Sequence, residues 1–196
     1  EYLTALDNFQ SSGVIVFSSG NSTYESDVDL MGALPEFFPD LAEAWISVGY
    51  MDFTGDSIAG AVESEFSMGG NKCGSAQEYC VVADGTHVYG ATYVSGSTHY
   101  YKDNLSGSSF SAPMISGGIA LLAQAFPNHT PAQLTDRLLA SANNEWFTAE
   151  GTTTFTTHGN SVTHGYHSTW GQGLPDFYAA MSPITSNSNP AMALYM

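Results

Sequence analysis

The sequence predicts an α/β domain built on a mainly parallel sheet. Short apolar runs rich in β-branched residues alternate with segments whose apolar residues recur at helical spacing. The runs are continuous rather than alternating, which is typical of strands that are covered on both faces. The 196 residues, of which 43% are apolar, suffice for one domain with a real hydrophobic core.

The predicted strands are the most apolar segments of the chain, at 14–17, 45–49, 80–83 and 87–89. The first of them, VIVF, lies between a glycine and a Ser-Ser-Gly-Asn turn, as expected for a short buried strand. Residues 95–107 are rich in Gly, Ser, Asn and Tyr and are predicted to form a loop. Residues 144–170 are predicted to form a second loop, with a hairpin as the alternative.

Helices are predicted at 3–10, 110–122, 131–139 and 176–181. The third has the clearest beginning. Thr130 suits the N-cap, Pro131 suits the first helical position, and Gln133 completes a capping box.

Charge and hydropathy exclude two classes of partner. Three basic residues stand against 19 acidic ones, so the formal net charge is −16. Nucleic acids and anionic membrane surfaces require a basic footprint, and neither is expected to bind. The chain has no apolar run long enough to span a bilayer, so we expect no membrane insertion.

The two cysteines indicate an oxidising compartment. Cys73 and Cys80 enclose six residues, beginning with Gly-Ser. This spacing predicts a small loop closed by a disulfide, with two free buried thiols as the alternative. A secreted or cell-surface location is therefore expected. The first residues, EYL, lack the Met and basic stretch of a signal peptide, so we expect a piece of a longer protein.

The segment GSSFSAPMISG at 107–117 predicts a nucleophile. A loop ends at a glycine-flanked serine pair, and a helix opens there. Unpaired amides at a helix start favour negative charge, so Ser109 is well placed to attack a carbonyl. A simple N-cap is the alternative. Pro113 is expected in the first turn of this helix, and Gly117 is expected to allow close packing on a neighbour.

Asn21 carries a carboxamide at the end of the turn that follows the predicted strand at 14–17. At a strand end such a group is a suitable donor for a developing oxyanion. The same residue begins an Asn-Ser-Thr glycosylation pattern, and a glycan there would block that role.

Five segments, in order, resemble the subtilisin-like serine proteases. The run at 107–117 is similar to the family's Gly-Thr-Ser-x-Ala-x-Pro-x-Val-x-Gly signature, with Ser108 in place of Thr, and VIVFSSGN is similar to the strand leading to the oxyanion Asn. WISVG, EFSMG and WGQGLPD resemble a core strand, a Phe-Ser-x-Gly turn and a late Gly-x-Gly stretch. The resemblance implies a three-layer subtilisin-like fold, with 1–196 as the C-terminal part of one catalytic domain. The cysteine loop resembles the passenger domains of Gram-negative autotransporters.

The resemblance implies a serine endopeptidase that hydrolyses protein or peptide substrates through an acyl-enzyme. Ser109 corresponds to the nucleophile and Asn21 to the oxyanion donor. One wall of the primary specificity pocket would be formed by Ser18, Ser19 and Gly20, with its base near Ala33.

The family's Asp and His precede the oxyanion Asn, and residues 1–20 hold neither motif and no histidine. A serine without its base is a poor nucleophile, so we expect an upstream part of the same catalytic domain to supply both groups. DGTHVYG at 84–90 resembles the family's histidine motif, but Asp84 stands where the histidine belongs. We predict a strand and turn there, with a catalytic His87 as the minor alternative.

Two other functions remain open. Ser109, Asp136 and His164 follow the chain order of an α/β-hydrolase esterase, although the second glycine of Gly-x-Ser-x-Gly is missing. The second alternative function is that of a non-catalytic subtilisin-like binding module.

No cofactor or metal is expected. Acidic residues between 25 and 56 leave calcium possible without a twelve-residue loop pattern, and histidines 158, 164 and 167 are expected in a solvated loop.

Overall fold

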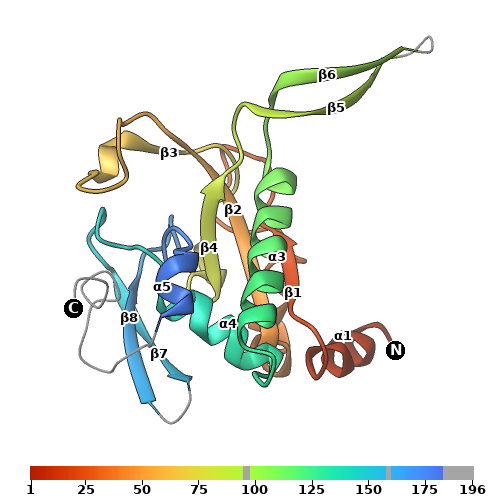
Figure 1. The fold of residues 1–196 in the computed structure, drawn as a ribbon, viewed down its shortest axis with the longest axis vertical. Helices are drawn as coiled ribbons and strands as arrows, with labels where there is room; N and C mark the ends of the chain where they lie inside the picture. Colours follow the sequence, from red (N-terminus) through yellow and green to blue (C-terminus); the bar gives the residue numbers. More distant parts are fainter. Residues whose placement is uncertain (95–97, 158–159, 183–196) are drawn as a thin grey trace.

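A four-stranded sheet forms the centre of the molecule (Figure 1). The computed structural model describes residues 1–94, 98–157 and 160–182. Strand β2 (Trp45–Phe53) lies between β1 (Ile15–Ser18) and β4 (Cys80–Asp84), and both pairs are parallel. The short β3 (Phe66–Met68) pairs antiparallel with the end of β2. The predicted α/β fold with a mainly parallel sheet is therefore confirmed.

The sheet is covered on both faces in its central strands. Every residue from 45 to 49 and from 80 to 83 is buried. Such strands read as continuous apolar runs because neither face meets water. Helix α3 (Ser108–Ala125) packs along β1, β2 and β4, and it buries Ile115 and Leu122 completely.

The remaining helices are short, and all except the one at 34–37, which the sequence did not predict, lie close to their predicted positions. They are α1 (Tyr2–Gln10), α2 (Leu34–Phe37), α4 (Pro131–Ala140) and α5 (Phe177–Met181), with 3-10 turns η1 (Pro39–Ala44), η2 (Glu63–Glu65) and η3 (Gly74–Ala76). The capping box of α4 is confirmed. The Gln133 amide donates to Thr130 Oγ1 at 3.2 Å, and the Thr130 amide donates to Gln133 Oε1 at 3.0 Å.

Two antiparallel hairpins complete the fold. They are β5 (Val88–Val94) with β6 (Thr98–Leu105), and β7 (Gly151–Thr157) with β8 (Asn160–Tyr166). The prediction of a loop over 95–107 is wrong for most of that segment. Tyr, Thr and Val favour strands, and cross-strand pairing outweighs the loop-like Gly and Ser content. Figure 1 shows the β5–β6 hairpin extending away from the body of the molecule.

Helix α3 corrects two predictions. A Cβ added to Gly117 would meet nothing within 4 Å, whereas one on Gly118 would overlap the Phe177 ring of α5. The close approach is therefore one residue later than expected. Pro113 lies in the second turn rather than the first. Because proline has no amide hydrogen, the Ser109 carbonyl receives no intrahelical bond from it.

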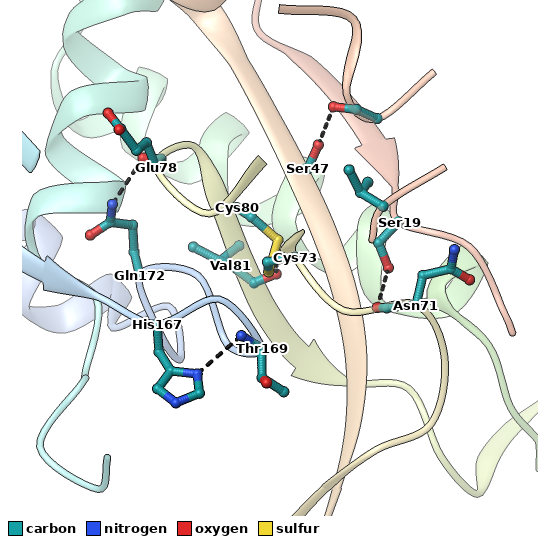
Figure 2. Close-up of a disulfide and its surroundings, with 12 residues drawn as sticks. Ser19, Ser47, Asn71, Cys73, Glu78, Cys80, Val81, His167, Thr169 and Gln172 are labelled. Atoms are coloured by element: carbon teal, nitrogen blue, oxygen red, sulfur yellow. Dashed lines mark hydrogen bonds between the residues drawn. A yellow bond between two sulfur atoms is a disulfide. The ribbon is translucent and has the colours of Figure 1, made fainter. Parts of the chain in front are cut away.

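Cys73 and Cys80 form the predicted disulfide, and both residues are fully buried (Figure 2). The loop that it closes is tied to the turn after β8, since the Gly74 amide donates to Ser168 O at 2.7 Å. Within the described ranges, no helix has both the length and the apolarity needed to cross a membrane.

Candidate active site

The strand end that carries Asn21 and the helix start that carries Ser109 meet in space. Asn21 Oδ1 accepts hydrogen bonds from the Ser108 amide at 2.8 Å and from Ser108 Oγ at 2.9 Å. A Cβ built on Gly107 would lie 3.5 Å from Asn21 Nδ2 and 3.5 Å from Ser109 Oγ. The carboxamide and the hydroxyl therefore flank one point beside Gly107.

The Asn21 side chain has a defined orientation. Both groups of Ser108 are donors, so the atom that faces them must be the amide oxygen. The NH₂ group then faces away from Ser108, and it has no hydrogen-bond partner among the described residues. Asn21 is exposed, so this donor is open to an incoming negative charge.

Ser109 combines an accessible hydroxyl with an amide that has no acceptor among the described residues. It is exposed, and it is the second residue of α3. The first amides of a helix have no intrahelical acceptor, and the helix dipole makes that end partly positive. The Ser109 amide and Asn21 Nδ2 can thus stabilise an oxyanion that forms next to the Ser109 hydroxyl.

The end of β4 holds the start of α3 from the other side. Ser111 Oγ donates to the carbonyls of Ala83 and Asp84, both at 3.2 Å. The Gly107 amide donates to Gly85 O at 2.9 Å. The carboxyl ends of β1 and β4 therefore position the helix start, at the sheet edge where open α/β folds bind ligands.

The residues predicted to form a pocket wall differ in burial. Ser19 is fully buried, and its hydroxyl donates to Asn71 O at 3.1 Å (Figure 2). Its side chain is therefore unavailable to a substrate. Gly20 has φ +111°, and a Cβ there would lie 2.5 Å from Asn71 Oδ1 and Asp29 Oδ2, so only glycine fits. Ser18 is half-buried at the end of β1, and Ala33 is buried at the start of α2. Their contacts with substrate stay predictions.

Among the described side chains, no imidazole hydrogen-bonds to Ser109. His87 is exposed in the turn after β4, with φ +52°. His164 is buried, with Nδ1 2.7 Å from Gln172 Oε1 and Nε2 2.8 Å from Ala142 O. Burial lowers the pKa of His164, against the opposing effect of these hydrogen bonds.

The esterase triad is wrong. Both nitrogens of His164 are engaged by other groups, Gln172 Oε1 and Ala142 O, so this ring does not serve Ser109. Asp136 accepts a backbone hydrogen bond from Thr156 on β7 rather than orienting a histidine. Burial raises the pKa of Asp136 to about 6.

Two of the acidic residues that left calcium possible, Asp27 and Asp29, make structural contacts. Asp27 Oδ1 accepts from the Ser75 amide at 2.7 Å and from Ser75 Oγ at 2.9 Å. Asp29 Oδ1 accepts from Asn71 Nδ2 at 3.2 Å. In the part of the chain that the structure describes, no three His, Cys, Asp or Glu residues form a group suited to a metal.

The predicted solvated histidine loop is wrong for His164, which is buried within β8. His167 Nε2 lies 3.6 Å from Glu150 Oε1 and 3.8 Å from Glu63 Oε1. Its Nδ1 accepts from the Thr169 amide at 3.0 Å (Figure 2). His158 lies outside the described residues.

A hydroxyl at a helix start, beside unpaired amide donors at the carboxyl ends of parallel strands, is typical of hydrolases that work by acyl transfer. Residues 2–173 match the model of the Subtilase family. The chain belongs to this family.

Two curated relatives are similar to part of the chain. Serotype-specific antigen 1 of Mannheimia haemolytica is 31% identical over 134 residues, which is 67% of this chain and 13% of the relative. The extracellular serine protease of Serratia marcescens is 27% identical over 139 residues, or 62% of this chain and 12% of the relative. The chain thus spans a small part of the length of these proteins.

Solved structures show the same fold. The prenylagaramide maturation protease PagA aligns with a TM-score of 0.58 at 20% identity, over 91% of this chain and 53% of its own. Fervidolysin from Fervidobacterium pennivorans, a keratinolytic enzyme related to subtilisin, aligns with a TM-score of 0.54 at 22% identity. That alignment covers 94% of this chain and 25% of fervidolysin.

Proposed function

We propose that this chain is the nucleophile-bearing part of a serine endopeptidase. The observation that carries the proposal is the juxtaposition of Asn21 Nδ2 and Ser109 Oγ around Gly107. Membership of the Subtilase family supports it, because the solved structures with this fold include proteases. The substrates are proteins or peptides, the class on which proteases act.

In the proposed reaction, Ser109 Oγ attacks the scissile carbonyl carbon while its proton passes to an imidazole of the upstream part. The Ser109 amide and Asn21 Nδ2 hold the oxyanion of the tetrahedral intermediate. The C–N bond breaks as the leaving amine takes the proton, and an acyl-enzyme remains. Water then hydrolyses the ester and releases Ser109.

Two surfaces fit an upstream part that brings the Asp and His. Among the described strands, β1 pairs only with β2, so its other edge is open to a further strand. The flank of α3 that continues from Ser109 carries small exposed residues, Ser116, Gly117 and Ala120. Small residues let a second helix approach closely, which would bring an imidazole next to the serine.

A secreted or cell-surface location is proposed on two observations, whereas the autotransporter type is proposed on the resemblance of the cysteine loop alone. The buried disulfide suits an oxidising compartment. One relative is named an extracellular serine protease.

Labelling with a fluorophosphonate probe tests the proposal. In the full-length protein we expect one modified residue, Ser109, and complete loss of labelling in Ser109→Ala. Asn21→Ala should retain the target serine but lower kcat by about 10²–10³, a magnitude measured on subtilisin, a member of the same family. Ser116→Ala, on the same helix, is the matched control.

Modification of another serine would refute the assignment. An active-site probe that labels nothing in the intact, folded protein would favour the non-catalytic binding module. The two results are separated by mass spectrometry of the labelled peptides.

A further inference from the structure

The β5–β6 hairpin is an arm that leads directly into the proposed nucleophile. Figure 1 shows it projecting from the body, with its base beside the start of α3. Val88 pairs with Leu105 at that base, and the chain then turns through Gly107 into Ser109. An isolated two-stranded ribbon is only marginally stable in water, so such an arm gains stability from whatever binds it.

The arm carries a stacked pair of exposed tyrosines. Tyr89 on β5 is 69% exposed, and Tyr101 on β6 is 68% exposed. Their ring centroids lie 5.6 Å apart with 8° between the planes. Two large ring faces are thus presented to solvent where the β5–β6 register shifts, between Val88 and Gly90. Tyrosine is enriched at interfaces because it buries a large area while losing little conformational freedom.

The pair lies within reach of a bound substrate. Tyr101 precedes Ser109 by eight positions, which at about 3.3 Å per step sets an upper bound of roughly 26 Å between their Cα atoms. An extended polypeptide whose scissile carbonyl sits at Ser109 covers that span with about eight residues on one side of the bond. The open edges of the ribbon can also pair with such an extended backbone.

We propose that the Tyr89–Tyr101 pair is a docking surface for the extended polypeptide that flanks the scissile bond. The inference rests on the proposed function, because it takes its occupant to be the substrate held at Ser109. Continuity of the arm with the start of α3 favours this occupant over a second copy of the chain. The rings contact substrate residues remote from the bond, so they contribute to binding and not to the chemical step.

The test uses the full-length protein and two substrates with the same four residues before the scissile bond. The short substrate carries a chromogenic leaving group directly after these four residues. The long substrate is internally quenched and extends the peptide by eight further residues on each side of this core. In the double variant Tyr89→Ala/Tyr101→Ala, we expect KM for the long substrate to rise about tenfold. Kinetics on the short substrate and labelling of Ser109 should stay unchanged.

Two further variants serve as controls. The first tests whether the aromatic rings themselves are needed, and the second tests whether removing any exposed tyrosine has the same effect. Tyr89→Phe/Tyr101→Phe keeps the stacked faces and should restore KM for the long substrate. Tyr178→Ala removes a tyrosine that is 70% exposed on α5 and should change neither substrate. Equal thermal midpoints for all variants would show that the alanine variant is folded.

Equal KM values of wild type and double variant on the long substrate would overturn the docking surface. So would an equal rise on both substrates, or a loss of dimers in the alanine variant at unchanged KM. In each case normal labelling of Ser109 would leave the proposed function intact. Wild-type protein that is not labelled at Ser109 would instead refute the proposed function itself.

Discussion

Ser108 fixes the orientation of the Asn21 carboxamide through two donors, its amide and its hydroxyl. The hydroxyl is also 3.2 Å from Gly20 O, and the residue is 1% exposed. In Ser108→Ala the amide bond remains and the hydroxyl bond is lost. A net hydrogen bond is worth about 1 kcal/mol, so we expect kcat to fall roughly fivefold.

The measurement is steady-state hydrolysis of a short peptide by the full-length protein. Ser108→Thr keeps the hydroxyl and should restore kcat, which a purely structural role of the side-chain volume would not produce. An unchanged kcat in Ser108→Ala would show that the backbone amide alone orients Asn21.

Asp136 couples stability to pH. Its pKa is raised from 3.8 to about 6 by burial, so the folded state binds this proton more tightly than the unfolded chain does. Stability therefore falls as pH rises from about 4 to 6 and stays reduced above that range. Asp136→Asn removes the charge and keeps an acceptor for the Thr156 amide.

We expect Asp136→Asn to stabilise the domain by about 1–2 kcal/mol at pH 8, since solvent screens part of the burial effect. At pH 2.5 the carboxyl is protonated in both states, and wild type and variant should unfold at similar temperatures. Asp7→Asn on the exposed face of α1 is the control. A gain of equal size at both pH values would contradict the coupling.

At the residue scale, the sequence predicted the positions of the site better than their environment. The motifs singled out Ser109 and Asn21, and the fold brings them together. Burial was harder to predict, because it depends on elements distant in sequence. Ser19 hydrogen-bonds to Asn71, and His164 hydrogen-bonds to Gln172 and Ala142. No local sequence pattern predicts these contacts.

The packing of α3 on α5 depends on one of two adjacent glycines. A Cβ at Gly118 would overlap the Phe177 ring, so Gly118→Ala must displace α5 or the ring. Overpacking of this kind costs about 1–3 kcal/mol. Gly117→Ala is the matched control, since its Cβ would meet nothing within 4 Å in the described chain. There alanine should stabilise the helix by up to about 1 kcal/mol.

Denaturant midpoints of the two variants should therefore move in opposite directions. If a helix of the upstream part covers Gly117 in the intact protein, that variant loses its gain there while the effect at Gly118 persists. Stabilisation by Gly118→Ala would contradict the observed contact with Phe177.

Elements with strong local signals were predicted from the sequence, and elements held by pairing were not. The capping box at Thr130 and the apolar runs of β1, β2 and β4 match the structure closely. The β5–β6 hairpin contradicts the prediction of a loop over 95–107. Its strands are stabilised by cross-strand neighbours such as Tyr89 and Tyr101, and a window along one strand does not contain its partner.

The whole molecule is strongly acidic, with a formal net charge of −16. Within the described residues, the close contacts between a carboxylate and a basic side chain both involve His167, with Glu63 and Glu150, and they become ion pairs only when the imidazole is protonated. Few basic groups therefore lie close enough to offset the repulsion between carboxylates, and this repulsion destabilises the folded state. Raising NaCl from 20 to 300 mM shortens the Debye length to below about 10 Å, so the repulsion is screened. We expect the Tm of the domain to rise by about 2–4 °C, equivalent to roughly 1 kcal/mol.

KCl should raise the Tm equally, because screening depends on ionic strength alone. Calcium chloride at matched ionic strength is the informative comparison, since an additional rise would require a specific divalent site. A fall in Tm with NaCl would mean that attractive pairs outweigh repulsion, contrary to the charge distribution.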